Sequence, residues 1–344
     1  MSRYPEKYLD RASDFLESKN IDFTGQKILI TGGSGFVGSW VIDLLRYYTE
    51  KRSQNIEILG LTRKLNLTKQ KLGNENFEFI QWVEGGVEKI KDLNFQFTHA
   101  LHAATPATKE SGLDDTFNMH FASVEGMHLL LERAQKNMNH PRVLHTSSGA
   151  VYGKRNTELN NFPLIQDPNG IPLDKSLKYF EYALTKRKAE LLLNNGTLKG
   201  FVSGLNARLF AFYGPGLPTK SHYAIGNLID QGLNSKKLQL NGNGEAIRSY
   251  LPVNIMAATI LCALESEIEG ATHIGSDEGY TLKYWAELVA DIVGKEIQFL
   301  GNFDDSDDKY VPEIDERVSG MHLAHPHREI LTDWIEYMNG VEIQ

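Results

Sequence analysis

The sequence predicts an α/β protein in which a doubly wound parallel sheet carries a smaller C-terminal α/β lobe. Short apolar runs alternate with helix-like segments through the first part of the 344 residues, and the run Lys27–Thr31 ends in a Gly-rich turn. After Phe212 the residue pattern changes, because Gly, Pro and Asn become frequent and the helix-like segments are shorter. Strands that alternate with helices form a parallel sheet covered on both faces, and we expect the remainder to form the lobe.

Each element follows from a local pattern. Residues 36–48 have helical spacing behind the Gly-rich turn, and 5–18 have the pattern of a short amphipathic helix ahead of the core. The predicted strands are 27–31, 55–61, 77–80, 99–104, 142–146 and 202–210, and the predicted helices are 5–18, 36–48, 121–135 and 179–194. This order predicts an N-terminal helical extension at 1–24, a main domain at 25–212, and a lobe at 213–344 whose chain is able to return to the main sheet.

Composition excludes several classes of protein. The net charge is −8 and the chain has no long basic run, which argues against a general nucleic-acid binder. No apolar stretch approaches the ~20 residues that a membrane helix needs, and the polar residues 1–23 do not resemble a secretory signal. The single cysteine, Cys262, has apolar neighbours and is expected to be a buried structural thiol. We therefore expect a cytoplasmic protein with no membrane or nucleic-acid partner.

The turn after the first strand has the spacing Gly33-x-Gly35-x-x-Gly38. Glycines at these positions permit a tight turn and let backbone N–H groups approach a pyrophosphate at a helix N-terminus. An ordinary Gly-rich turn is the alternative, but the preceding apolar strand and the following helix favour a dinucleotide site. The main domain is therefore predicted to be a Rossmann-type dinucleotide-binding and catalytic domain. Its cofactor-lining residues are expected to be Gly32, Gly35, Phe36, Val37 and Gly38.

The end of the second strand indicates which dinucleotide binds. An Asp or Glu there accepts a hydrogen bond from the ribose 2′-hydroxyl, whereas an Arg suits a 2′-phosphate. The chain offers Thr62-Arg63-Lys64 and no acid at this point. NADP(H) is therefore favoured and NAD(H) stays possible, with Arg63 as a cofactor-binding residue. In the alternative interpretation Arg63 caps the strand and stacks on adenine.

A Tyr and a Lys four residues apart, Tyr182 and Lys186, lie in the predicted helix 179–194. Positions i and i+4 share a helix face, so the two side chains should project together. A nearby ammonium lowers the pKa of a phenol, which then removes the proton of an alcohol while its C–H leaves as hydride. In the reverse direction the phenol protonates the new alkoxide. Ser148, at the end of a predicted strand, is expected to position the substrate oxygen.

Together these motifs resemble the extended short-chain dehydrogenases/reductases, in the branch that modifies nucleotide-diphosphate sugars. The matching segments span roughly residues 25–255, and a similar lobe continues to about 335. They are 31–38, 102–104, 147–153, 182–186, Arg208 with 213–215, and 248–250. The resemblance implies a Rossmann domain, a sugar-nucleotide lobe, and a homodimer packed through two helices per subunit, here those around 124–135 and 179–194.

The resemblance also implies roles for individual residues of the main domain. Ser148, Tyr182 and Lys186 match the catalytic triad, and Tyr182 and Lys186 would also contact the cofactor. Ala103 and Ala104 match positions that line the cofactor.

Three matches fall in the lobe. Arg248 matches an arginine that binds the substrate diphosphate, and a surface salt bridge is its alternative role. Asn227 matches a diphosphate-contacting asparagine, and a helix-start cap is its alternative. Leu240 belongs to a segment that resembles the strand beside the nucleotide base.

Departures from the family pattern narrow the chemistry. Similar 4,6-dehydratases carry Asp-Glu directly after the triad Ser or Thr, and UDP-glucuronate decarboxylases resemble them with a Glu nearby. This chain has Gly149 and Ala150 there, and neither transfers a proton. We therefore predict a 4-ketoreductase or a 4-epimerase. The alternatives are a nucleotide-sugar dehydratase or decarboxylase, a reductase of a non-nucleotide carbonyl compound, and a non-catalytic dinucleotide sensor.

No metal site is predicted. His322, His325 and His327 cluster near the C-terminus, but Pro326 interrupts them and a polar loop accounts for them better. The acidic run 304–308 lacks the Gly and the terminal Glu of a calcium loop, so we expect a solvated loop.

Overall fold

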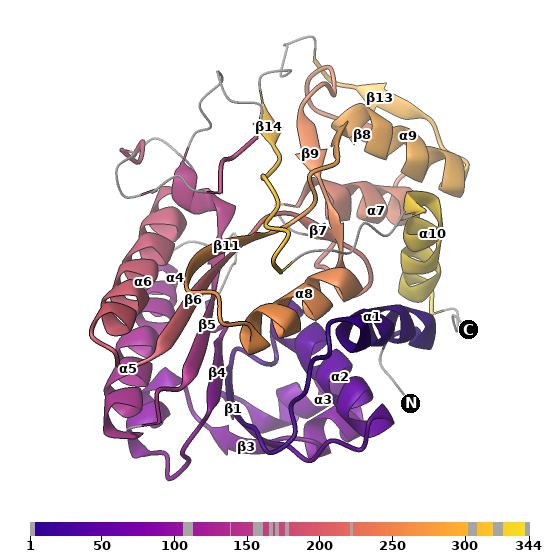
Figure 1. The fold of residues 1–344 in the computed structure, drawn as a ribbon. Helices are drawn as coiled ribbons and strands as arrows, with labels where there is room; N and C mark the ends of the chain where they lie inside the picture. Colours follow the sequence, from indigo (N-terminus) through magenta and orange to yellow (C-terminus); the bar gives the residue numbers. More distant parts are fainter. Residues whose placement is uncertain are drawn as a thin grey trace.

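A seven-stranded parallel sheet forms the centre of the protein (Figure 1). The computed structural model describes residues 4–105, 113–137, 139–153, 161–164, 168, 172–175, 179–220, 223–301, 308–318 and 326–340. The strand order is β11-β6-β5-β4-β1-β2-β3, which confirms the predicted doubly wound Rossmann-type fold. The strands are β1 (Lys27–Thr31), β2 (Glu57–Thr62), β3 (Gln81–Glu84), β4 (His99–His102), β5 (Arg142–Ser148), β6 (Ser203–Leu209) and β11 (Gly270–Ile274).

Helices cover both faces of this sheet, as the alternating side chains of β1 require. Ile28 and Ile30 enter a core shared with α2 and α8, whereas Leu29 enters the opposite core with α5 and α6. Figure 1 shows α4, α5 and α6 along one flank and α1, α2 and α3 along the other. The elements are α1 (Glu6–Ser18), α2 (Phe36–Lys51), α3 (Leu65–Glu78), α4 (Leu113–His120), α5 (Gly126–Asn137), α6 (Phe180–Leu198), α8 (Val253–Glu265), the 3₁₀ turns η1 (Val87–Asp92) and η3 (Gly149–Tyr152), and the π-helical turn η2 (Phe121–Glu125).

In its described residues, the smaller lobe is built from three short sheets and three helices. The sheets pair β10 with β7, β12 with β9 and β14, and β13 with β8. Their chain returns to the main sheet once, because β11 pairs in parallel with β6. The boundary near residue 212 stays a prediction. The elements are β7 (Phe212–Tyr213), α7 (Ala224–Asn234), β8 (Leu238–Leu240), β9 (Ile247–Ser249), β10 (Leu251–Pro252), β12 (Gly279–Thr281), α9 (Leu282–Val293), β13 (Ile297–Phe299), β14 (Lys309–Tyr310) and α10 (His327–Met338).

The N-terminal helix α1 connects the main sheet region to the lobe. It packs on α2 and α8, and the Tyr8 hydroxyl donates a 2.5 Å hydrogen bond to Asp333 of α10. Just before the helix, the Tyr4 ring stacks on Trp40 with centroids 3.6 Å apart. The buried Trp40 indole in turn donates to the Pro215 carbonyl, 2.9 Å away.

One predicted strand is wrong. The segment 77–80 ends helix α3 and leads into β3, which starts only at Gln81. Its apolar side chains close the helix end, since Phe77 stacks on Trp82 with centroids 5.8 Å apart and Ile80 is buried. The true strand lies at the sheet edge with half-exposed side chains, so it has no apolar run to mark it.

Candidate active site

The Gly-rich turn lies at the carboxyl end of β1, where α2 begins at Phe36. Gly32 has a φ of +75°, and a Cβ on it would come within 2.4 Å of the Ala103 carbonyl oxygen. A Cβ on Gly38 would come within 2.4 Å of the Gly32 carbonyl oxygen. The backbone therefore packs more closely here than side chains allow, at a helix start of the kind that binds pyrophosphate.

The neighbouring residues predicted to line the cofactor are brought to the same place. Phe36 and Val37 form the first turn of α2 and are partly buried. Ala103 and Ala104 directly follow β4, and the Ala103 N–H donates to the Thr31 carbonyl at 3.1 Å. The turn thus lies between β1 and β4, the point where the strand order reverses and where doubly wound folds bind ligands.

Arg63 lies directly after β2 and is exposed. Sequence reasoning missed an acid close to it, because Glu84 belongs to a different strand. Glu84 ends β3 in register with Thr62, and its carboxylate accepts a 3.4 Å hydrogen bond from the Leu65 N–H. The end of β2 therefore carries both a cation and a neighbouring carboxylate.

The three residues of the predicted catalytic triad come together. Ser148 ends β5, and Tyr182 and Lys186 lie on successive turns near the start of α6. Ser148 lies close enough to Tyr182 for its hydroxyl to lower the Tyr182 pKa, and Ser148 Oγ accepts from the Ala150 N–H at 3.2 Å. Lys186 Nζ lies 5.8 Å from the centre of the Tyr182 ring. The i, i+4 prediction of a shared face agrees with this geometry.

Burial governs the ionisation of this pair. It raises the pKa of Tyr182 to about 12, against the hydrogen bond from Ser148, which lowers it. Burial also lowers the pKa of Lys186 to about 7, against the Glu190 carboxylate, which raises it. The sequence argument expected the Lys186 charge to lower the Tyr182 pKa, but in the chain alone burial raises this pKa instead. The Tyr182 phenol is therefore protonated at neutral pH.

Lys186 is held by oxygen acceptors on β5 and just after β4. Its Nζ donates to the Thr146 carbonyl at 2.5 Å and to Thr105 Oγ1 at 2.9 Å. Two buried imidazoles, His102 and His145, lie close enough for the Lys186 charge to lower their pKa values further after burial has lowered them. Both imidazoles are therefore neutral at physiological pH.

A buried polar network supports the triad, and sequence reasoning found little of it. Arg208 of β6 makes a two-pronged ion pair with Glu190 of α6, with Nε–Oε1 at 3.0 Å and Nη2–Oε2 at 2.9 Å. Arg208 Nη1 donates to the Tyr152 hydroxyl at 2.7 Å, and this hydroxyl lies 2.6 Å from His273 Nε2. Ser147 Oγ donates to Glu190 at 2.5 Å. The network fixes the strand end that carries Ser148 to the helix that carries Tyr182.

Arg248 lies on β9 and forms an ion pair with Asp308. Its Nη2 contacts Asp308 Oδ2 at 2.6 Å, and its Nη1 donates to the Asp308 and Ile247 carbonyls at 2.9 Å each. Strand β14 runs parallel to β9 with Tyr310 in register with Arg248. The alternative role as a salt bridge is thus present in this structure, on a side chain that is still partly exposed.

Asn227 and Leu240 lie on other parts of the lobe. Asn227 is the fourth residue of α7, whose N-cap is Tyr223, so it does not cap the helix start. Leu240 ends β8 and is buried. The contacts of the described residues join neither side chain to Ser148.

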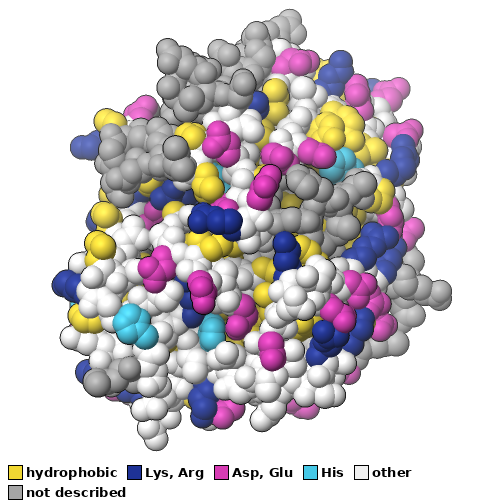
Figure 2. All heavy atoms as spheres, viewed as in Figure 1, with side chains coloured by type: hydrophobic (Ala, Val, Ile, Leu, Met, Phe, Trp, Pro, Cys, Tyr) yellow, Lys and Arg dark blue, Asp and Glu magenta, His cyan; other side chains and the backbone are white. Residues whose placement is uncertain are grey.

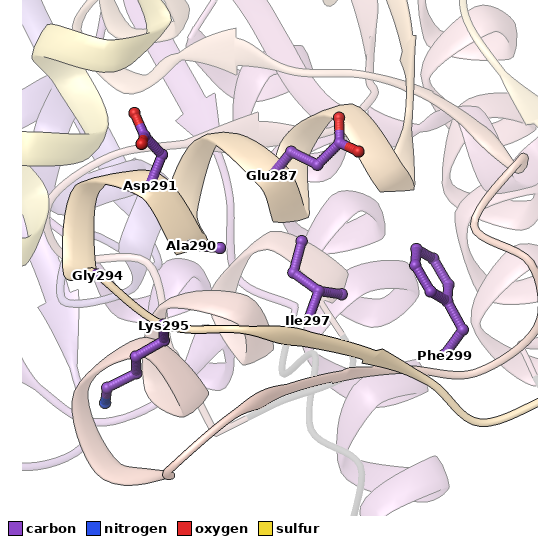
Figure 3. Close-up of a pocket in the computed structure, with 7 residues that line it drawn as sticks. All are labelled: Glu287, Ala290, Asp291, Gly294, Lys295, Ile297 and Phe299. Carbon is purple, nitrogen blue, oxygen red and sulfur yellow. The ribbon is translucent and has the colours of Figure 1, made fainter.

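Other regions of the surface are separate from these residues. An open hollow of about 450 Å³ lies between α9 and β13, and Figure 3 shows Glu287 and Asp291 above Ile297 and Phe299. None of the predicted site residues lines it. On the face seen in Figure 2, acidic and basic side chains are interspersed over the described surface.

Several remaining predictions concern single residues. Cys262 is buried and its pKa is raised to about 12, which confirms an unreactive thiol. His327 contacts the Tyr213 hydroxyl through Nδ1 at 2.8 Å, whereas His322, His325 and 304–307 lie outside the described residues. Among the helices of the described ranges, none is long and apolar enough to cross a membrane.

Comparison with known proteins identifies similar chains. A model of the NAD dependent epimerase/dehydratase family matches residues 28–275. UDP-glucuronic acid decarboxylase 1 of Xenopus tropicalis is 26% identical over 328 residues, which cover 91% of this chain and 72% of the decarboxylase.

Solved structures agree in fold. UDP-N-acetylglucosamine 4-epimerase of Methanobrevibacter ruminantium, in complex with UDP-N-acetylmuramic acid, has a TM-score of 0.74 at 19% identity, covering 92% of this chain and 99% of the epimerase. A dTDP-glucose 4,6-dehydratase of Bacillus anthracis, in complex with NAD, has a TM-score of 0.71 at 19% identity, covering 92% and 98%. At this identity the likeness concerns the fold alone.

Proposed function

The chain belongs to the NAD dependent epimerase/dehydratase family, and we propose that it is a nucleotide-diphosphate-sugar oxidoreductase or isomerase that works at C4 of the sugar. The reaction is a 4-keto reduction or a 4-epimerisation. One observation carries the proposal: the Ser148–Tyr182 pair is assembled at the end of β5, while Gly149 and Ala150 beside it carry no carboxyl group. Elimination of water across C5 and C6 needs a base and an acid beside the sugar, and these two positions supply neither.

The turn 32–38 fits a dinucleotide. The close backbone approach at Gly32 and Gly38 leaves no room for side chains, so a dinucleotide would meet backbone there. Phe36, Val37, Ala103 and Ala104 would complete the pyrophosphate and nicotinamide sides, with Tyr182 and Lys186 toward the ribose. A nicotinamide bound there supplies hydride exchange with carbon.

The residues of the chain supply the proton chemistry. Ser148 is placed to hold the C4 oxygen, and the protonated Tyr182 phenol to donate its proton to that oxygen as it becomes an alkoxide. A phenol whose pKa is raised to about 12 favours the reductive direction in the chain alone. Lys186, fixed by the Thr146 carbonyl, orients the ribose side of the site and stabilises the phenolate once the proton has left.

Arg248 is proposed to bind the diphosphate of the substrate. Its guanidinium is already held in place by Asp308, so a diphosphate would either share or displace this carboxylate. Asn227 and Leu240 are proposed to complete the nucleotide end of the site on α7 and β8.

We expect Arg63→Ala to change the choice of cofactor. A hydrogen bond from Arg63 to a 2′-phosphate is worth about 1.5–3 kcal/mol, so the ratio of kcat/KM for NADPH to that for NADH should fall about tenfold or more. Steady-state kinetics with both cofactors measure this ratio, with Lys69→Ala on the surface of α3 as the matched control. An unchanged ratio would show that Arg63 does not read the 2′-phosphate.

Homodimerisation is proposed through α5 and α6. Large apolar side chains are exposed on this flank, namely Phe117 of α4 (68%), Leu191 (50%) and Leu198 (88%) of α6. We expect Leu191→Arg to convert a dimer to a monomer, because it places a charge in the apolar interface. Sedimentation velocity measures the assembly state. The equally exposed Leu300 lies after β13, and Leu300→Arg should leave the dimer intact.

A second candidate is oxidative decarboxylation of a nucleotide-linked uronic acid, which the decarboxylase relative favours. Oxidation at C4 makes a β-keto acid, and the C5–C6 bond then breaks as CO₂ leaves and its electron pair enters the C4 carbonyl. Decarboxylation needs no carboxylate at residue 149 or 150. The Gly149-Ala150 pair therefore argues against elimination of water but not against decarboxylation.

The test is the loss of NADPH absorbance when the protein meets a panel of nucleotide-linked 4-keto-6-deoxy sugars. Stoichiometric loss with one sugar establishes the ketoreductase. Interconversion of ordinary nucleotide hexoses without net cofactor loss indicates the epimerase, and CO₂ release from UDP-glucuronate indicates the decarboxylase. Dinucleotide binding without any turnover would favour a sensor.

A further inference from the structure

A second tyrosine hydroxyl reaches the catalytic serine from the lobe. The Tyr310 hydroxyl of β14 lies close enough to Ser148 for the serine to lower the Tyr310 pKa against the effect of burial. A Cβ on Gly149 would lie 2.4 Å from the Tyr310 hydroxyl oxygen. The phenol therefore fills the space that a side chain at residue 149 would need, which is where the similar dehydratases carry an acid.

The Tyr310 ring is rigidly held. It packs against Phe210 with centroids 4.9 Å apart and against Phe162 at 5.5 Å. Burial raises its pKa well above the ordinary value, so its hydroxyl stays protonated and is a hydrogen-bond donor, not a base.

Counting protons gives the hydrogen bonds a direction. A serine hydroxyl has one proton and two acceptor lone pairs. Ser148 Oγ accepts from the Ala150 N–H, and Tyr182 and Tyr310 both lie close enough for the serine hydroxyl to lower their pKa values. Its single proton serves one tyrosine, so the other tyrosine must donate to Ser148. Since Tyr182 is the group that becomes a phenolate, the charge-stabilising arrangement runs from Tyr310 to Ser148 to Tyr182.

We propose that Tyr310 is a positioning residue that donates to Ser148 Oγ and so directs the serine proton toward the Tyr182 side of the site, where the C4 oxygen would bind. The role deepens the proposed C4 chemistry and rests on it. This role also explains the glycine at residue 149, because any larger residue there would push the Tyr310 hydroxyl away from Ser148.

Register adds a link to substrate binding. Tyr310 pairs with Arg248 across β14 and β9, so the serine donor and the proposed diphosphate ligand belong to one small sheet.

The kinetic test is Tyr310→Phe, which removes only the hydroxyl. We expect kcat to fall about tenfold, as for the loss of one net hydrogen bond, with KM little changed. The alkaline limb of the pH–rate profile should move to higher pH, because the Tyr182 phenolate loses indirect stabilisation. In a Ser148→Ala background the same substitution should have no further effect. Tyr280→Phe on the neighbouring strand β12 is the matched control, since its hydroxyl faces Glu278.

A second measurement does not depend on turnover. In protein with isotope-labelled tyrosine, NMR follows the titration of Tyr182, assigned by its absence in Tyr182→Phe, with and without oxidised cofactor. Tyr310→Phe and Gly149→Ala should both raise the Tyr182 pKa. An unmoved titration, a wild-type rate for Tyr310→Phe, or an equal loss in the Ser148→Ala background would each overturn the proposal. A shifted titration in a protein that turns over no sugar would overturn the proposed function and leave the role of Tyr310 intact.

Discussion

Tyr182→Phe is expected to lower kcat for sugar reduction about 10³-fold, the middle of the range for loss of a positioned acid or base. The Tyr182 phenol lies beside Ser148 and combines a transferable proton with a lysine on the next helical turn. Phenylalanine preserves the ring and its packing, so KM and cofactor affinity should change little.

Stopped-flow loss of NADPH absorbance under single turnover separates the chemical step from product release, and calorimetric titration follows cofactor binding. Tyr47→Phe on the outer side of α2 removes a hydroxyl that contacts only surface groups and should be neutral. A Tyr182→Phe enzyme that keeps more than a tenth of the wild-type rate would show that the proton comes from another group.

Arg208→Met is expected to lower the free energy of unfolding by about 3–5 kcal/mol, because it leaves a buried carboxylate without its partner. The side chains of Arg208 and Glu190 are only 6% and 1% exposed, and the pair makes two parallel hydrogen bonds. Tyr152 and Ser147 lose a common anchor at the same time.

Urea unfolding measured by circular dichroism gives this difference. The control is Arg52→Met, which breaks the exposed pair with Glu17 and should cost less than about 1 kcal/mol. The double variant Glu190→Leu/Arg208→Met should recover part of the loss, since no charge is then left unpaired. A loss of less than about 1 kcal/mol for Arg208→Met would contradict the view that the pair supports the site.

The parts of the site that sequence predicted are those encoded by local spacing. The Gly-rich turn lies between a strand and a helix, and Tyr182 and Lys186 lie one helical turn apart, so each pattern contains its own geometry. The strand after residue 77 was misplaced because an edge strand is half exposed and lacks the apolar run that marks a buried one.

Contacts between distant segments were beyond local patterns. Glu84 approaches the end of β2 only through strand pairing, and Tyr310 reaches Ser148 only because β14 pairs with β9. Arg208 was recognised as a motif residue, but its partner Glu190 had no pattern of its own. The pKa of Tyr182 depended on how deeply the helix is buried, which no spacing encodes.

The return of β11 to the main sheet has a consequence for biosynthesis. As the chain leaves the ribosome, β6 is made well before β11, and the residues from 205 to 209 then present an unpaired edge. Such an edge is open to pairing with another nascent chain. The edge of β6 therefore stays unpaired until Ile274 has left the ribosome. A chaperone would be most useful during this interval. Fragments that stop near residue 212 would keep this edge permanently, and their expression should yield aggregates even though every nucleotide-binding strand is present.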